Sequence, residues 1–163
     1  MPHVQFTHLL AAYRHGLNEA GFVEGRNVTL EYRFADGNYD RLSGLAADLV
    51  NRRVAVIFAS AGTPTALAAK AATSAIPVVF VIGGDPVTFK LVQSLNQPGG
   101  NVTGFTLISD ETVNKRLELL LELVPTTAVI GVLANLKNPM NQPQLIELQA
   151  AASAWDEIQQ FLR

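Results

Sequence analysis

The hydrophobic and polar positions of this chain form patterns that predict strands alternating with helices. Continuous apolar runs occupy 54–59, 77–82 and 128–135. Strands without polar alternation are typical of a parallel sheet that is buried on both faces. An alternating, β-branched run predicts another strand at 27–35, and a short extended piece follows at 101–106. The pattern therefore indicates an α/β fold with a parallel sheet.

Apolar residues at helical spacing predict helices between these strands and at both ends of the chain. An alanine-rich stretch between the first two apolar runs would let its helix pack close to the sheet. Ser109 stands where the N-cap of a later helix is expected, and the acidic residues after it favour the helix dipole. The predicted helices cover 3–20, 39–53, 64–74, 86–95, 110–124 and 140–162.

The three apolar runs all end in the same way. Small or polar residues follow each run, and a capping-type residue then stands directly before a proline: Thr63, Asp85 and Asn138. A capping side chain accepts a hydrogen bond from an unpaired N–H of the first helical turn. Proline at the first helical position lacks an N–H that would stay unpaired anyway. Each unit therefore predicts a strand, a tight loop and the start of a helix.

These helix starts predict a site for a small anionic ligand. In a parallel sheet they lie at the carboxyl ends of the strands, where open α/β folds bind ligands. Helix N-termini favour anionic groups such as a carboxylate. The small residues Ser60, Ala61, Gly62, Gly83 and Gly84 would let a ligand approach the backbone closely. The alternative stays open, because caps and small loop residues also occur where no ligand binds.

Asp85 has two candidate roles in this arrangement. Its carboxylate could accept hydrogen bonds from an ammonium group, or it could cap the helix predicted to follow it. We favour the cap, although the two roles are compatible.

Composition and charge exclude several classes of protein. With 163 residues, 48% of them apolar and 16% charged, the chain can form one cored domain, or one domain and part of another. The net charge of −2 argues against a nucleic-acid partner. The absence of cysteine excludes disulfides and thiolate zinc sites. No apolar run is long enough to span a bilayer, and the first residues lack the order of a signal peptide.

The sequence contains no catalytic or cofactor-binding constellation. The three histidines all fall in the first predicted helix, where a solvated face is the simpler explanation than a metal site. Ser60 lacks the glycine elbow of a hydrolase nucleophile. The stretch AGTPTALAAK departs from a P-loop, and no G-x-G-x-x-G motif follows a strand. We therefore expect no enzymatic activity, no cofactor and no metal.

An ordered set of motifs resembles one family of binding proteins. The motifs are G-x-x-E-G-x-N, G-T-P, G-G-D-P and N-Q-P-G-G-N-V-T-G, with Gln97 in place of the usual arginine. The stretch from about 9 to 153 resembles the ABC transporter substrate-binding proteins of the tryptophan/tyrosine-type uptake family. That resemblance implies the type I periplasmic binding protein fold, in which two Rossmann-like lobes hold a ligand in a cleft. It also implies an extracytoplasmic location and an ABC permease as partner.

The resemblance also implies which residues face the ligand. On the first lobe these would be Ser60, Ala61, Gly62, Thr63, Gly83 and Asp85, and Asn135 would open the side of the second lobe. The implied ligand is an amino acid, aromatic in type, or a related small carboxylate. This ligand class agrees with the residues themselves, because an acidic side chain suits the amino group and helix N-termini favour the carboxylate.

The chain is shorter than the family pattern, which runs to about twice this length. We expect residues 1–125 to form a first lobe without its initial strand, and 126–163 to form a strand-helix unit like the start of the second lobe. Because the initial strand is central in such a sheet, we hypothesise that 128–134 fill its place, within one chain or in a homodimer by strand exchange. Alternative functions are a ligand-sensing or dimerisation module, a Rossmann-type enzyme, or a non-functional gene fragment.

Overall fold

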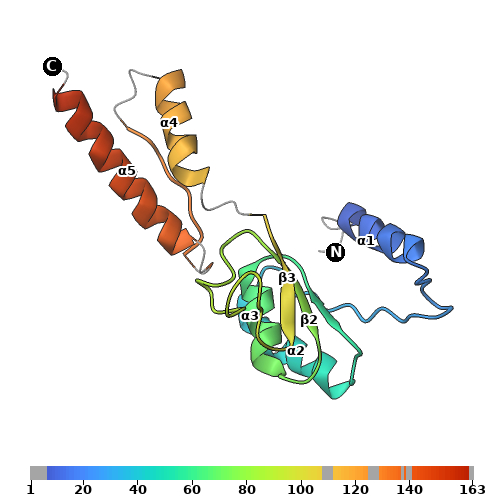
Figure 1. Ribbon diagram of the computed structural model, residues 1–163. Coiled ribbons are helices and arrows are strands. Elements are labelled where there is room, and N and C mark those ends of the chain that lie inside the picture. Colours follow the sequence, from blue (N-terminus) through green and yellow to red (C-terminus); the bar gives the residue numbers. More distant parts are fainter. Residues whose placement is uncertain (1–6, 108–111, 125–128, 137, 139–140, 162–163) are drawn as a thin grey trace.

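The computed structural model describes residues 7–107, 112–124, 129–136, 138 and 141–161, with the side chains of the last helix described up to 153. Among the described residues, three α-helices and a 3-10 helix precede or flank a small sheet, and two more α-helices follow it (Figure 1). In chain order the elements are α1 (Thr7–Glu19), the 3-10 helix η2 (Tyr39–Arg41), α2 (Leu42–Asn51), β1 (Ile57–Ala59), α3 (Thr63–Ala72), β2 (Val78–Ile82), β3 (Val102–Thr106), α4 (Val113–Leu123) and α5 (Asn141–Phe161).

The sheet is parallel, with three strands in the order β1-β2-β3. Ile57 pairs with Val78, which in turn pairs with Val102 on the other side. The prediction of an α/β fold with a parallel sheet is therefore confirmed for this part of the chain, although β1 and β2 begin later than the apolar runs do. The predicted burial of the strands on both faces is wrong, since alternate residues such as Phe58 are exposed. The helices predicted at 39–53 and 64–74 are confirmed as α2 and α3.

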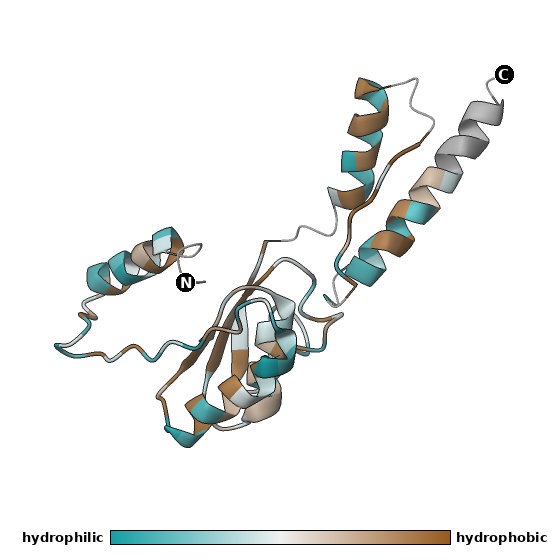
Figure 2. Cartoon of the chain, turned by 180° about the vertical axis from the view of Figure 1, so that it is seen from behind, coloured by the Kyte–Doolittle hydropathy of each residue, from teal (hydrophilic) through white to brown (hydrophobic). Residues whose placement is uncertain are grey.

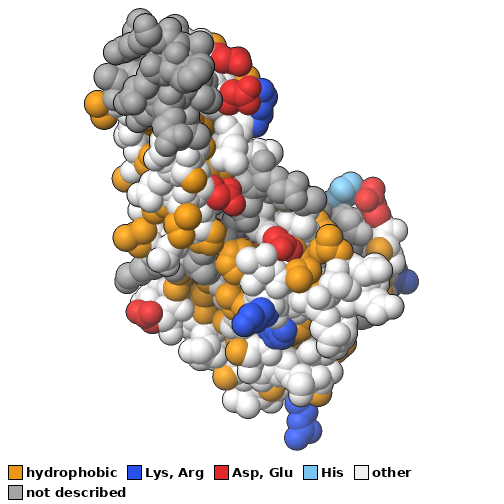
Figure 3. All heavy atoms as spheres, turned by 60° about the vertical axis from the view of Figure 1, so that its left-hand side comes forward, with side chains coloured by type: hydrophobic (Ala, Val, Ile, Leu, Met, Phe, Trp, Pro, Cys, Tyr) orange, Lys and Arg blue, Asp and Glu red, His pale blue; other side chains and the backbone are white. Residues whose placement is uncertain are grey.

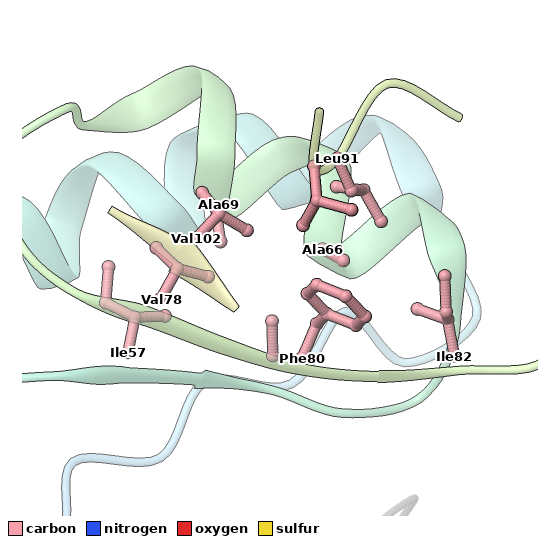
Figure 4. Close-up of a cluster of buried hydrophobic side chains, with 10 residues drawn as sticks. Ile57, Ala66, Ala69, Val78, Phe80, Ile82, Leu91 and Val102 are labelled. Atoms are coloured by element: carbon pink, nitrogen blue, oxygen red, sulfur yellow. The ribbon is translucent and has the colours of Figure 1, made fainter. Parts of the chain in front are cut away.

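The core lies between one face of this sheet and α3. Val78, Phe80 and Ile82 alternate along β2 and are at most 1% exposed, and they point toward Ala66 and Ala69 of α3 (Figure 4). Because these two helix positions carry only methyl side chains, the helix axis can come close to the strands. Leu91 and Val92, from the segment after β2, complete the cluster.

Glycine is required where β3 passes beside Phe80. A Cβ built at Gly104 would lie 2.1 Å from the backbone oxygen of Phe80 and 2.7 Å from its ring. No side chain fits in that space, so the close approach of β2 and β3 depends on this residue.

The opposite face of the sheet is largely uncovered. The side chains of Val56, Phe58, Phe105 and Leu107 are 51%, 40%, 60% and 71% exposed. Tyr13 of α1 stacks on the Phe58 ring, with the centroids 4.7 Å apart. The hydrophobic effect therefore acts mainly on one side of this sheet.

The predicted strand at 27–35 is wrong in this structure. Residues 29–35 form no strand, and only a single bridge joins Glu24 to Val28. The segment is instead tied to α2 by its side chains, since the Arg33 guanidinium contacts the Asp48 carboxylate at 2.5 Å. A strand needs a neighbouring ladder for its N–H and C=O groups, and none of the three strands in the described sheet pairs with this segment.

The predicted helix at 86–95 is also wrong. The chain makes turn-type hydrogen bonds, from Phe89 N–H to Asp85 O and from Leu91 N–H to Pro86 O, and does not continue as a helix. Lys90 adopts φ of 54°, in the left-handed region that ends a helix. The Lys70 ammonium then donates to the carbonyls of Lys90 and Leu91, which fixes the turn against α3.

The last part of the chain, here called the arm (112–161), consists of α4, an extended segment and α5. The two helices contact each other and lie beyond the sheet unit (38–107) (Figure 1). Helix α5 confirms the helix predicted at 140–162, whereas the predicted N-cap Ser109 and the proposed boundary at 125/126 fall outside the described residues. Residues 129–135 are not a strand here, contrary to the prediction for 128–135. Completion of a sheet by these residues stays a prediction.

Candidate ligand-binding site

Two of the predicted ligand loops leave the same edge of the sheet. Because β1 and β2 are adjacent and parallel, with Ala59 paired to Phe80, both strands end on one side. The loop 60–63 leads from β1 into α3, and the loop 83–85 follows β2. The structure thus brings the six predicted first-lobe contacts to a common rim, while their role in binding stays a prediction.

The loop after β1 has a strained backbone that exposes its small residues. Ala61 and Gly62 have φ of 78° and 104°, and an alanine in the left-handed region costs roughly 1–2 kcal/mol. Gly62 caps α3 without a side-chain hydrogen bond, and its carbonyl accepts from the N–H of Thr65 at 3.2 Å. Ser60 and Ala61 are exposed, so a ligand could reach this backbone directly.

Thr63 occupies a different position from the predicted one. It is the first residue of α3 and not its cap, and it is completely buried. Its hydroxyl oxygen has no hydrogen-bond partner among the described residues. An unpaired buried hydroxyl costs about 1–3 kcal/mol, so this helix start carries a polar group that a neighbouring partner would stabilise.

The loop after β2 is held in place by the end of β3. The Thr106 hydroxyl donates to the carbonyl of Gly84 at 2.7 Å, and Leu107 N–H donates to Ile82 O at 2.9 Å. Gly84 is buried, while Gly83 beside it is half-buried. Thr106 was not predicted from the sequence, although a hydroxyl residue at the carboxyl end of a neighbouring strand was a usable signal.

Asp85 caps the turn that follows β2, as the favoured interpretation predicted, although no helix forms there. Its carboxylate accepts from Thr88 Oγ1 at 2.6 Å, from Val87 N–H at 2.9 Å and from Thr88 N–H at 3.2 Å. The hydrogen bond from the Thr88 hydroxyl, followed by that from Val87 N–H, lowers the pKa of Asp85 below its usual value. The exposed carboxylate is therefore charged at neutral pH and accessible to a cation.

Asn135 lies in the arm, apart from the sheet loops along the chain. Its carbonyl accepts from the N–H of Asn138 and from the Asn141 side chain, both at 2.9 Å. These bonds close the turn that leads into α5. Its grouping with the first-lobe loops stays a prediction.

Part of the rim is exposed, including Ser60, Ala61 and Asp85. Two surface hollows formed by described residues lie elsewhere: one beside α1, lined by Leu17 and Phe22, and another lined by Lys70 and Pro98. None of the predicted contact residues lines either hollow. Among the described residues, no three histidine or acidic side chains gather to hold a metal ion, and no described helix is long and apolar enough to cross a membrane.

Comparison with known proteins decides the family. The family model described as ABC transporter substrate binding protein matches residues 6–156. The chain belongs to that family. The resemblance seen in the sequence motifs is therefore confirmed, and so is the α/β fold of its members.

Individual relatives are longer than this chain. It is 36% identical over 120 residues to the tyrosine-binding protein of Clostridioides difficile (strain R20291), covering 73% of this chain and 34% of the relative. A conserved domain protein from Vibrio cholerae O1 biovar eltor has a TM-score of 0.76 at 37% identity, over 89% of this chain and 49% of that one. An ABC domain from Streptococcus pneumonia, solved in complex with L-Trp, has a TM-score of 0.73 at 26% identity, over 88% and 47%. The chain thus spans about half the length of these two solved structures. Its match to the curated relative covers about a third of that protein.

Proposed function

We propose that this chain provides one side of a binding site for aromatic L-amino acids in an ABC importer. The observation that carries the proposal is the parallel pairing of β1 and β2, which brings the start of α3 and the Asp85 carboxylate to one rim. The names of two relatives support the ligand class, since one is called tyrosine-binding and another was solved with L-Trp.

The chemistry of the rim suits the two charged groups of an amino acid. The positive end of the α3 dipole favours the ligand carboxylate, and the loop 60–62 is exposed beside it. The N–H groups of Thr65 and Ala66 already bond to the Gly62 carbonyl, so this attraction acts mainly through the dipole. The charged carboxylate of Asp85 would accept hydrogen bonds from the ligand ammonium while it still caps its own turn. The aromatic side chain would then lie away from the rim, toward a second lobe.

The proposal includes a non-enzymatic role in uptake. Membership of a substrate-binding family supports binding followed by delivery to a permease, outside the cytoplasm. A rim on one lobe leaves most of the ligand in water, whereas tight sites bury most of the ligand surface. We therefore expect this chain alone to bind in the millimolar range or more weakly, which corresponds to about 4 kcal/mol or less.

Titration of the isotope-labelled chain, followed by amide chemical shifts, tests this function. L-Trp, L-Tyr and L-Phe should shift the signals of Ala61, Gly62 and Gly83 with millimolar affinity. Tryptamine lacks the carboxylate and indole-3-propionate lacks the ammonium, so each should shift only part of this set, and Asp85→Asn should remove the difference between L-Trp and indole-3-propionate. Submicromolar binding would contradict the one-sided site, and the absence of shifts at these loops would refute the binding role.

A further inference from the structure

A surface hollow beside the last turn of α3 carries two lysines. It has a volume of about 470 Å³ and is lined by Lys70 of α3 and by residues of the segment 87–99, which follows β2. Hollows of roughly 300–1,000 Å³ are typical of sites for small molecules. The hollow shares no lining residue with the proposed amino-acid site, so it can be considered by itself.

The hollow concentrates the few charges of this part of the chain. Between 54 and 107 the charged residues are Lys70, Asp85 and Lys90. Figure 2 shows hydrophobic colour along the strands of the sheet unit, with hydrophilic colour on its helices and loops. Basic side chains lie next to hydrophobic ones over the sheet unit in Figure 3. Both lysines line the hollow, while none of its described lining residues is acidic. In a chain of net charge −2, this local positive potential would attract an anion.

The turn that forms one wall of the hollow holds Lys70 in place. The Lys70 ammonium donates to the carbonyl of Lys90 and, at 3.2 Å, to that of Leu91. An ammonium has three N–H donors, so these two bonds leave a donor for a ligand. Because the side chain is already fixed, it loses little freedom when an anion binds. The ammonium of Lys90 comes from the same turn and is exposed.

The glycine-rich loop 96–101 is tied to this part of the molecule on both sides. The Gln93 side chain lies so close to Gly99 that a Cβ built there would be 2.3 Å from it. Gln93 N–H donates to Pro98 O at 2.9 Å. The Asn101 side chain donates to two carbonyls just after α3, at 3.1 and 2.7 Å. These contacts fix the shape of the hollow, and they give the glycine-rich motif a structural role away from the rim.

We propose that this hollow binds a small phosphomonoester, with its phosphate between the ammonium groups of Lys70 and Lys90. A phosphomonoester carries a charge of about −1.5 to −2 at pH 7, which matches two lysines, whereas a carboxylate brings a single charge. Lysine binds phosphate as a point charge. The apolar walls at Val87, Val92 and Pro98 would contact the organic part of the ligand, and Val87 is 37% exposed for that contact.

Titration of the isotope-labelled chain with phenyl phosphate, followed by amide chemical shifts, provides the first test. The signals of Gln93 and Gly99 should shift, while those of Ala61 and Gly62 at the rim stay in place. Inorganic phosphate should bind more weakly because it leaves the apolar walls uncovered, and phenyl sulfate should bind more weakly because it carries one charge. Unmoved Gln93 and Gly99 signals would overturn the proposal. Equal affinity for phenyl phosphate and either of the other two anions would also overturn it.

A charge variant and a change of pH provide the second test. Lys90→Gln removes one ammonium but keeps the carbonyl that Lys70 contacts, so the turn should persist and the affinity for phenyl phosphate should fall roughly two- to fivefold. Lys115→Gln, on the exposed surface of α4, is the matched control and should bind like the wild type. Below the second pKa of the phosphate, about 6, wild-type binding should weaken. Equal affinities of the two variants, or binding that does not change with pH, would refute the proposal.

Discussion

The sheet unit and the arm are built from similar sequence patterns, yet the larger core lies in the sheet unit. In the arm, the buried apolar side chains are those of Val113, Leu117 and Leu121 on α4. In the sheet unit Phe80 and Ile82 are 1% exposed, whereas in the arm Leu123 and Leu133 are 80% and 103% exposed. Both units contain helices that the sequence predicted. The difference lies in the strands, since β2 has a partner on each side and 129–135 have none in the described sheet. Helices satisfy their hydrogen bonds locally, whereas strands depend on neighbours.

The largest effect should come from emptying the core of the sheet unit. Phe80→Ala removes a ring that is 1% exposed, and we expect a loss of about 3–5 kcal/mol in the free energy of unfolding. The matched variant Phe105→Ala lies on the uncovered face, where the ring is 60% exposed, and should cost less than about 1 kcal/mol. Urea unfolding followed by circular dichroism measures both, and similar losses would contradict a one-sided core.

A smaller effect should follow from adding a methyl group where β3 meets β2. Gly104→Ala places a Cβ 2.1 Å from the Phe80 oxygen, so the strands must separate, at a cost of about 1–3 kcal/mol. Gly131→Ala in the arm meets nothing within 4 Å and should be nearly neutral in this state. Thermal unfolding of the two variants compares them directly. If Gly104→Ala left the unfolding temperature unchanged, β2 and β3 would not be packed in this register.

The hydrogen bond between Thr106 and Gly84 tests how the rim is held. Thr106→Val leaves the buried Gly84 carbonyl without that donor, and we expect a loss of about 1 kcal/mol together with faster amide exchange in the loop 83–85. Thr106→Ser keeps the hydroxyl and should restore slow exchange. Thr103→Val, on the exposed part of the same strand, is the control. If Thr106→Ser exchanges as fast as Thr106→Val, the hydroxyl does not position this loop.

The smallest effect concerns the charge of Asp85. Its pKa is lowered, chiefly by the hydrogen bond from the Thr88 hydroxyl, so the cap stabilises the fold at pH values above the unfolded pKa, about 3.9. This contribution is lost as the pH falls through the lower, folded pKa. Carboxyl carbon shifts measured by NMR should give a value below that of a model aspartate. Thr88→Val should raise the pKa of Asp85 toward that of a model aspartate. A wild-type pKa at or above that of the model aspartate would contradict the capping role of Asp85.

Local patterns were enough to predict several elements. The apolar spacing of α5, the alanine-rich helix α3 and the continuous apolar strand β2 all carry their own signal. The Asp85-Pro86 pair has the same signature as a helix start. The left-handed backbone at Lys90 nevertheless limits this segment to turns, so no helix forms. The alternating run at 27–35 has a strand pattern, yet pairing depends on a neighbour that the pattern does not describe.

The rim shows the same division between local and non-local information. The sequence predicted that the loops at 60–63 and 83–85 share an edge, because parallel strands impose it. It also predicted the capping role of Asp85, which uses donors only two and three residues away. The contact of Thr106 with Gly84 spans 22 residues, and the burial of Thr63 depends on how α3 settles on the sheet. Neither could be read from spacing.

The alanines of α3 act as spacers that set the height of the rim. Ala66 and Ala69 are 0% and 3% exposed, and their methyl groups fix how near the helix lies to the strands. Thr63 stands about one turn before Ala66 on the same helix, so a bulkier residue inside would lift the helix opening outward. A substitution at Ala66 or Ala69 in the core could thus move the loop 60–63 while every residue of that loop stays unchanged.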